Sequence, residues 1–325
     1  MEPSSKPIVQ FTFPTPDRTG FEELEAVCSV RYSDEHLAEP AAALNRLDTD
    51  ATVLATEFTQ PITAEFLSRF PRLKLVANYA VGFNNIDLDY TRRVGIAVAN
   101  TPNAVVTSTA ELTVGLLLAL TRRVAEWDRT MRRQRSSDKG GLGGGMGHDI
   151  FGKKAGIIGY GNIGRRVGTL LRAFGCEILY NKRTRLSSEE EQALGARYAT
   201  VDEILRECDI VSLHTPLNAD SRHLIDADAL ALMKPDAVLL NLARGPVVDE
   251  HALLDALKGG RIAGAGLDVF EFSDNPLDEL YDLPNVVLTP HVGTQTYEAR
   301  KDMRVELANN IIGFLTGDRH VSFVK

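Results

Sequence analysis

Apolar and polar segments alternate along the chain and predict a regular succession of strands and helices. Segments with helical spacing, such as residues 35–47 and 63–70, separate the apolar runs of the first hundred residues. We interpret these runs as strands at residues 8–13, 28–32, 51–55, 73–79 and 96–100. Strands that alternate with helices are typical of a doubly wound parallel sheet, so an α/β domain is expected here.

The same alternation returns after residue 154 and predicts a second α/β domain. Its helices are expected at residues 201–206, 227–233 and 250–258, and the chain closes with a long helix at 296–314. Its strands are expected at residues 155–158, 177–180, 210–214, 237–242 and 264–267, with a further strand end at 286–293. A chain of 325 residues is long enough for two domains, each with its own core.

The segment between the two series has a different pattern. Residues 105–131 predict one long helix whose middle is apolar nearly all round, which suits a junction between domains or subunits. Residues 136–147 contain six glycines but lack the Lys-Ser/Thr end of a phosphate loop. We interpret them as a flexible linker or lid.

A complete Gly-x-Gly-x-x-Gly motif joins the strand at 155–158 to a helical segment. Gly159 would permit the tight turn, Gly161 would let the backbone approach a pyrophosphate, and Gly164 would let the helix pack close to the strand. The helix N-terminus would offer N–H groups to the phosphates. A dinucleotide site is therefore predicted at this turn, the alternative being a turn that serves only packing. The motif consists of Gly159, Tyr160, Gly161, Asn162, Ile163 and Gly164.

The residues after the second strand of this unit favour NADP(H) over NAD(H). An acidic residue about twenty positions beyond the glycines would hold the ribose hydroxyls of NAD. This chain instead has Asn181, Lys182 and Arg183, followed by Arg185, with no carboxylate among them. Cations there would suit the 2′-phosphate of NADP. The alternative is a solvated basic loop on an NAD enzyme, so NAD(H) stays possible.

Composition narrows the class of protein further. The net charge of −8 disfavours a nucleic-acid partner. The three cysteines, Cys28, Cys176 and Cys208, have no metal-ligand spacing, so no metal site is expected. Their small number and irregular spacing also predict a reduced, cytoplasmic setting. The N-terminus shows no signal sequence, and no apolar run is long enough to span a membrane.

Two charged or titratable residues near strand ends fit the chemistry of hydride transfer to a carbonyl. The reaction needs a fixed cation beside the oxygen and an acid to protonate it. Arg244 fits the first role and His291 the second. The alternatives are that Arg244 forms a surface ion pair and that His291 is a histidine hydrogen-bonded to the backbone. In the first domain, the glycine of residues 80–87 could present N–H groups to an anion, or form a plain turn.

These motifs together resemble the D-isomer-specific 2-hydroxyacid dehydrogenases, most closely the branch of glyoxylate/hydroxypyruvate reductases and phosphoglycerate dehydrogenase-like enzymes. The similarity covers essentially the whole chain, with the motifs in the same order. The segments that carry it are residues 81–87 (VGFNNID), 100–102 (NTP), 159–164 (GYGNIG), 211–217 (VSLHTPL), 241–250 (NLARGPVVDE), 266–271 (GLDVFE) and 288–293 (LTPHVG).

The resemblance implies a fold, an assembly and a set of site residues. A Rossmann domain at 104–294 would be inserted in a flavodoxin-like substrate domain of residues 1–103 and 295–325, and two copies would form a homodimer through the helix near 107–124. Val81 and Gly82 would bind the substrate carboxylate, Arg244 the carboxylate and keto oxygen, and His291 would donate the proton. Besides the glycine turn and residues 181–183, the cofactor would contact Thr109, His214, Thr215, Pro216, Leu242, Ala243, Arg244, Asp268, His291 and Gly293.

One position departs from the family pattern. The glutamate that normally pairs with the histidine lies five positions beyond the counterpart of Asp268, where this chain has Ser273. A serine brings no charge with which to stabilise a protonated imidazole. Glu271 or Asp274 could substitute only if the loop shifted.

The sequence thus predicts an NAD(P)H-dependent reductase of small 2-keto acids such as glyoxylate or hydroxypyruvate. A second hypothesis, supported by Ser273, is a cofactor-sensing binding protein like the co-repressors that share this fold, with weak or no catalysis. Arg244 and His291 argue against it. Phosphite oxidation on the same scaffold would need additional cations at the substrate loop, and Lys74 lies a strand-length away.

Overall fold

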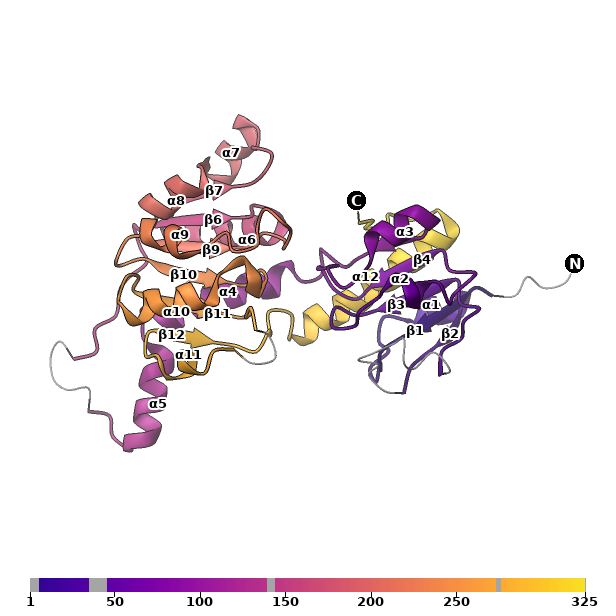
Figure 1. The fold of residues 1–325 in the computed structure, drawn as a ribbon, viewed down its shortest axis with the longest axis horizontal. Helices are drawn as coiled ribbons and strands as arrows, with labels where there is room; N and C mark the ends of the chain where they lie inside the picture. The colour runs from indigo at the N-terminus through magenta and orange to yellow at the C-terminus, as the bar shows by residue number, and fades with distance from the viewer. Residues whose placement is uncertain (1–5, 35–45, 139–143, 273–275, 325) are drawn as a thin grey trace, which may run out of the picture. The chain divides into compact units, whose positions relative to one another are not determined.

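Two compact units make up the computed structural model, which describes residues 6–34, 46–138, 144–272 and 276–324 (Figure 1). Unit 1 comprises Met1–Val105 together with Gln295–Lys325, and unit 2 comprises Val106–Thr294. Unit 2 is therefore inserted into the chain of unit 1. Most of the helix predicted at 35–47 lies outside the described residues.

Unit 1 is built on a five-stranded parallel sheet in the order β2-β1-β3-β4-β5. Its strands are β1 (Ile8–Phe11), β2 (Ser29–Arg31), β3 (Val53–Thr56), β4 (Leu75–Asn78) and β5 (Ala97–Ala99), and its helices are α1 (Glu22–Val27), α2 (Ala64–Leu67), α3 (Leu88–Val94) and α12 (Tyr297–Thr316). β3 and β4 are buried at every residue, as parallel strands covered on both faces should be. This order is the flavodoxin-like one, and the predicted doubly wound sheet is confirmed.

Unit 2 contains a seven-stranded parallel sheet in the order β12-β11-β10-β9-β6-β7-β8. Its strands are β6 (Lys154–Ile158), β7 (Glu177–Asn181), β8 (Ala196–Tyr198), β9 (Ile210–Leu213), β10 (Val238–Asn241), β11 (Gly264–Leu267) and β12 (Val286–Leu288). The chain runs from β6 to β7 and β8 on one side, then crosses to β9 on the other. The order reverses at β6, which is where ligands of such sheets bind.

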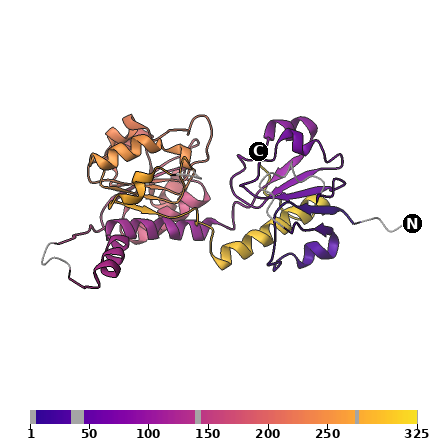
Figure 2. The same cartoon turned by 60° about the horizontal axis from the view of Figure 1, so that its bottom comes forward.

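Helices cover both faces of this second sheet, and each face has its own apolar core (Figure 2). The helices are α4 (Val106–Thr121), α5 (Val124–Gln134), α6 (Asn162–Ala173), α7 (Ser188–Leu194), α8 (Val201–Glu207), α9 (Ala227–Leu232), α10 (Glu250–Lys258) and α11 (Asp278–Asp282). One core contains Leu117 of α4 and Val167 of α6, and the other contains Leu205 of α8 and Leu253 of α10. The Rossmann architecture expected from the sequence is confirmed.

The single long helix predicted at 105–131 is wrong, because the structure has two helices there. α4 ends at Thr121, and α5 begins at Val124 after Arg123, which adopts a left-handed conformation with φ of 54°. A left-handed residue cannot continue a right-handed helix, so the direction changes at this point. Within the described segments, no helix is both long enough and apolar enough to cross a bilayer.

Candidate active site

The glycine turn after β6 has the geometry that a dinucleotide requires. Gly159 has φ of 96°, and a Cβ there would lie 2.4 Å from the backbone of His214. A Cβ on Gly164 would lie 2.2 Å from the carbonyl oxygen of Gly159, so α6 can approach β6 only with glycine at this position. A Cβ on Gly161 would instead meet nothing within 4 Å. The open side of Gly161, beside the N-terminus of α6, therefore fits a pyrophosphate.

The cations after β7 differ in what they contact. Arg185 forms two hydrogen bonds to Glu191, of 2.8 and 2.9 Å. Lys182 and Arg183 have no ion-pair partner in the part of the chain that the structure describes. Asn181 is fixed by its Nδ2, which donates to the carbonyl of Ala199 at 2.9 Å. Of the predicted phosphate-binding cations, Lys182 and Arg183 are thus the ones left for a ligand.

His214 lies at the end of β9, against the glycine turn. Its Nε2 is 2.8 Å from the hydroxyl of Ser212, and burial lowers its pKa to about 4. Its Nδ1 is buried and has no hydrogen-bond partner among the described atoms. A buried polar atom without a partner is uncommon in a native structure, so a ligand atom is expected there. This orphan nitrogen fits a bound dinucleotide, and Thr215 and Pro216 follow it.

Arg244 follows β10 and is fixed by a local turn. Asn241 accepts from the N–H of Ala243 at 3.1 Å and donates through Nδ2 to the carbonyl of Arg244 at 3.1 Å. The guanidinium of Arg244 donates to the carbonyl of Ala243 at 2.6 Å, and burial lowers its pKa. No described carboxylate forms an ion pair with it. A largely buried cation without a counter-ion is costly unless a ligand supplies the negative charge.

Asp268, at the end of β11, organises the loop that carries His291. Its carboxylate accepts from the hydroxyl of Thr289 at 2.6 Å and from the N–H groups of Val292 at 2.8 Å and Gly293 at 3.0 Å. The carbonyl of Asp268 also accepts from the N–H of His291 at 2.9 Å. His291 itself adopts φ of 54°, a strained conformation for a residue other than glycine. The loop is therefore held in one shape through Asp268.

Apart from Thr109, which lies in α4, the predicted site residues of unit 2 follow strands at one edge of its sheet. In the strand register, Ile158 pairs with both Asn181 and Leu213, and Asn241 pairs with both Leu213 and Leu267. The carboxyl ends of these strands are thus level, and the segments that follow them share one edge. These segments contain Gly159, Lys182, His214, Arg244, Asp268 and His291.

Glu271 and Asp274 are the two carboxylates that could replace the missing glutamate, and the structure describes only Glu271. Glu271 is already engaged, since its Oε1 accepts from Arg222 at 3.1 Å and lies 2.6 Å from Nε2 of His223. Asp274 lies outside the described residues, as does Ser273.

In unit 1, the loop after β4 contains Val81 and Gly82. Neither N–H group donates a hydrogen bond to a residue in the described ranges, whereas the carbonyls of both residues accept one. Such a pair of unpaired N–H groups is suited to an anion. Sequence reasoning predicted this loop but missed the asparagines that contact it.

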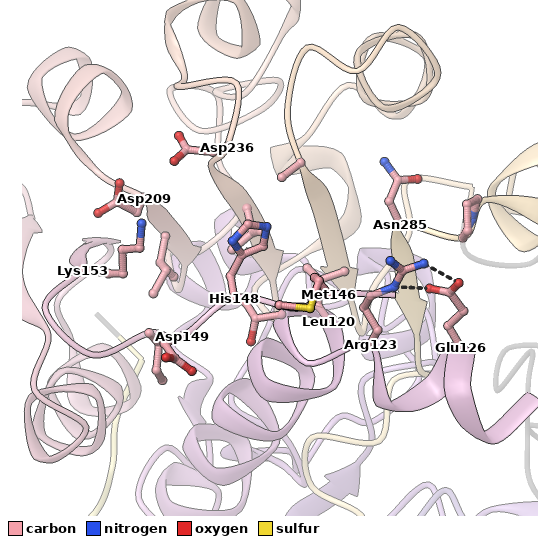
Figure 3. Close-up of a pocket in the computed structure, with 16 residues that line it drawn as sticks. Leu120, Arg123, Glu126, Met146, His148, Asp149, Lys153, Asp209, Asp236 and Asn285 are labelled. Atoms are coloured by element: carbon pink, nitrogen blue, oxygen red, sulfur yellow. Dashed lines mark hydrogen bonds and ion pairs between the residues drawn. The ribbon is translucent and has the colours of Figure 1, made fainter. Parts of the chain in front are cut away.

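A cavity of about 310 Å³ in unit 2 lies away from the carboxyl-end edge of the sheet (Figure 3). It is lined at the amino ends of strands, by Asp209 and Ile210 at β9 and by Asp236 and Val238 at β10. Arg123 and Glu126 point toward one another at its rim. Because dinucleotides bind at carboxyl ends, this cavity is not the cofactor site.

The strand order, the glycine turn at its reversal and the cation after β10 define the class of protein, a dinucleotide-dependent oxidoreductase of the Rossmann type. Comparison with known families agrees, since residues 114–293 match the model described as "D-isomer specific 2-hydroxyacid dehydrogenase, NAD binding domain". The chain belongs to the D-isomer-specific 2-hydroxyacid dehydrogenase family, and it is an NAD(P)-dependent 2-hydroxyacid dehydrogenase.

Similar proteins with solved structures include one that binds NADP and one that binds NAD. The chain is 42% identical over 316 residues to a glyoxylate reductase of Pyrococcus furiosus, covering 96% of this chain and 94% of that one. It is similar to an NADPH-dependent glyoxylate/hydroxypyruvate reductase of Sinorhizobium meliloti solved with NADP and malonate (TM-score 0.85, 30% identity, 98% and 97% covered). It is also similar to a D-lactate dehydrogenase of Aquifex aeolicus solved with NAD and lactic acid (TM-score 0.81, 30% identity, 96% of each chain covered).

Proposed function

We propose that this protein reduces a small 2-keto acid, such as glyoxylate or hydroxypyruvate, to the D-2-hydroxy acid, with NADP(H) favoured over NAD(H). The observation that carries the proposal is Arg244, a largely buried cation that has no carboxylate partner in the described chain. The carboxylate of a 2-keto acid would be the negatively charged partner that Arg244 does not have within the described chain. The glyoxylate reductases among the relatives support the same substrate class.

The residues of the chain divide the work of reduction. Arg244 binds the carboxylate and the keto oxygen and stabilises the negative charge that develops on that oxygen. Val81 and Gly82 hold the carboxylate through their N–H groups. The nicotinamide supplies the hydride when the cofactor is bound. His291 donates the proton, and Asp268 holds the loop in which His291 lies.

The cofactor is held by the glycine turn, by the ends of β7 and β9 and by the segments after β10 and β11. Lys182 and Arg183 would bind the 2′-phosphate of NADP(H), because a guanidinium matches phosphate oxygens in shape and charge. The side chain of Tyr160 is 1% exposed and stacks on Tyr180 with ring centroids 4.6 Å apart. Only the backbone of Tyr160 would therefore contact the cofactor.

We also propose a homodimer through the segment near 107–124, as the family resemblance implies, and large apolar side chains are exposed at the end of that segment and beyond it. Val124 is 56% exposed, Met131 is 51% exposed and Met146 is 69% exposed. A second copy that covers this group would remove it from water.

The test of the activity measures oxidation of NADPH and NADH at neutral pH with glyoxylate, hydroxypyruvate, pyruvate and phenylpyruvate. Turnover by the wild-type protein is expected, and Arg244→Ala should lower kcat/KM by about 1,000-fold, since it removes charge stabilisation in a water-poor site. Arg222→Ala is the matched control, because it removes a guanidinium that pairs with Glu271. No turnover of any keto acid, with tight NADPH binding by titration, would contradict the proposal and favour a cofactor sensor.

A further inference from the structure

Three consecutive carbonyl groups in the loop after β4 accept hydrogen bonds from other residues of unit 1. The carbonyl of Ala80 accepts from the N–H of Thr101 at 2.9 Å. The carbonyl of Val81 accepts from Nδ2 of Asn100 at 2.7 Å, and that of Gly82 from Nδ2 of Asn78 at 2.7 Å. The loop thus has its acceptors satisfied by unit 1 itself.

The N–H groups of the same peptide units form no hydrogen bonds to described residues. The peptide bonds of this loop are trans, so each carbonyl points away from the N–H of the next residue. Fixing the carbonyls of Ala80, Val81 and Gly82 therefore directs the following N–H groups, of Val81, Gly82 and Phe83, each away from the group that binds its carbonyl. None of these three N–H groups donates to a residue in the described ranges. Successive N–H groups that point the same way form a concavity for anions.

We propose that Asn78 and Asn100 are positioning residues whose carboxamides fix the peptides of this loop so that its N–H groups face the substrate carboxylate. Asn100 sets the N–H of Gly82, and Asn78 sets that of Phe83. The inference rests on the proposed function, since it names the residues that shape the substrate site, and it adds Phe83 N–H as a third donor.

Burial and hydrogen bonding fix the orientation of both carboxamides. Asn78 is completely buried, and its Oδ1 accepts from the hydroxyl of Thr56 at 3.0 Å. A carbonyl can only accept, so the NH₂ group of Asn78 must face Gly82. Asn100 is 8% exposed, its Nδ2 donates to the carbonyl of Val81, and its main chain is anchored because the backbone carbonyl accepts from Nδ2 of Asn310 in α12 at 2.8 Å. The two side chains are therefore held more firmly than a surface asparagine would be.

The experiment compares Asn78→Ala and Asn100→Ala with the wild-type protein. The measurements are KM for glyoxylate, kcat, Kd for NADPH, and Kd of the NADPH-saturated protein for oxalate, which has carboxylates but no reducible carbonyl. Each variant should raise KM and the oxalate Kd by about 10-fold to 100-fold, because each releases a buried carbonyl and lets the peptide rotate. Kd for NADPH should stay within about twofold of the wild-type value.

A matched control separates positioning from a general loss of structure. Asn85 also donates through Nδ2 to carbonyls, those of Glu57 and Gln60, both at 3.0 Å, but it does not contact the loop carbonyls. Asn85→Ala should leave the oxalate Kd unchanged. Should an alanine variant fail to fold, Thr56→Val removes the hydroxyl that orients Asn78 with little change in shape. It should raise KM and the oxalate Kd above the wild-type values, and wild-type values in Thr56→Val would overturn the role of Asn78.

Two failures are distinguishable. A wild-type protein that neither reduces a keto acid nor binds oxalate would overturn the proposed function. A wild-type protein that does both, with Asn78→Ala and Asn100→Ala keeping its KM and oxalate Kd, would overturn only the positioning role. Equal weakening by Asn85→Ala would overturn it as well.

Discussion

Arg183 and Arg185 are two residues apart, yet the structure gives them different surroundings. Arg185 is bound to Glu191 by two hydrogen bonds, and Glu191 also accepts from the hydroxyl of Tyr180 at 2.8 Å. Arg183 has no such partner in the described chain. Sequence alone could not separate these two cations, because the carboxylate that engages one of them comes from the following helix.

Arg183→Ala should therefore raise KM for NADPH by about 10-fold or more and leave KM for NADH nearly unchanged, because only NADPH carries the 2′-phosphate. Arg185→Ala is the matched control and should change both values little. Steady-state kinetics with each cofactor at saturating glyoxylate would check this. Equal effects of Arg183→Ala on both cofactors would argue against a 2′-phosphate contact.

His214 should make the folded protein less stable in acid. Burial lowers its pKa to about 4, whereas an unfolded chain protonates histidine near pH 6.5. Below pH 6.5 the unfolded state therefore binds a proton that the folded state does not, and stability falls until about pH 4. The loss from this residue should reach about 3 kcal/mol.

Urea unfolding of the wild-type protein and His214→Asn between pH 7 and pH 4 would check this expectation. The variant should lose less stability over that range, whatever its stability at pH 7. Parallel pH profiles for the two proteins would show that His214 is not held neutral in the folded state.

At the scale of elements, the glycine turn has two functions, approach of the cofactor and packing of α6 on β6, and separate variants test each of them. Gly161→Ala adds a methyl group to open space at φ of −85°, so the fold should be kept while Kd for NADPH rises by about 10-fold or more. Gly164→Ala places its Cβ 2.2 Å from the carbonyl oxygen of Gly159, so α6 must move away from β6. That variant should lower stability by about 2 kcal/mol or more.

Thermal unfolding and NADPH titration of both variants would check these outcomes. Unchanged NADPH affinity in Gly161→Ala would mean that the pyrophosphate does not approach the turn at that position.

Strong local patterns predicted most elements, and the exceptions have local causes. α10 begins and ends where the sequence predicts it, because Asp249 caps it and apolar residues recur at helical spacing. The break at Arg123 was missed, since an arginine gives no sign of a left-handed conformation. α7 and β8 were also missed. They are short, although a capping box at Ser187 and Glu190 marks the start of α7.

The site was predicted unevenly for a related reason. Arg244 and His291 are recognisable because they follow apolar strands within specific motifs. Asn78 and Asn100 look like ordinary strand-end residues, and their contacts to Gly82 and Val81 leave no periodic signal. The role of Asp268 in holding the loop of His291 could not be read either, because its partners lie more than twenty residues away. The roles of Val81, Gly82 and the cofactor-contacting residues stay predictions.

At the scale of the whole molecule, the exposed apolar side chains around α5 bear on assembly. Val124→Glu combined with Met131→Glu should shift the protein toward monomer, because charges would have to be buried in the interface. Sedimentation velocity of the variant and the wild-type protein would check this. A wild-type protein that sediments as a monomer at micromolar concentration would contradict the proposed dimer.

The insertion of unit 2 also determines the order in which the two halves can form on the ribosome. Unit 1 needs a segment from each side of unit 2, since Asn310 of α12 donates to the carbonyl of Asn100 and Glu306 accepts from Nδ2 of Asn103 at 2.7 Å. All of unit 2 is synthesised before α12 emerges. Domains usually fold from the N-terminus during translation, but here the nascent chain completes its inserted, cofactor-binding half first. Unit 1 can be completed only after α12 has been synthesised.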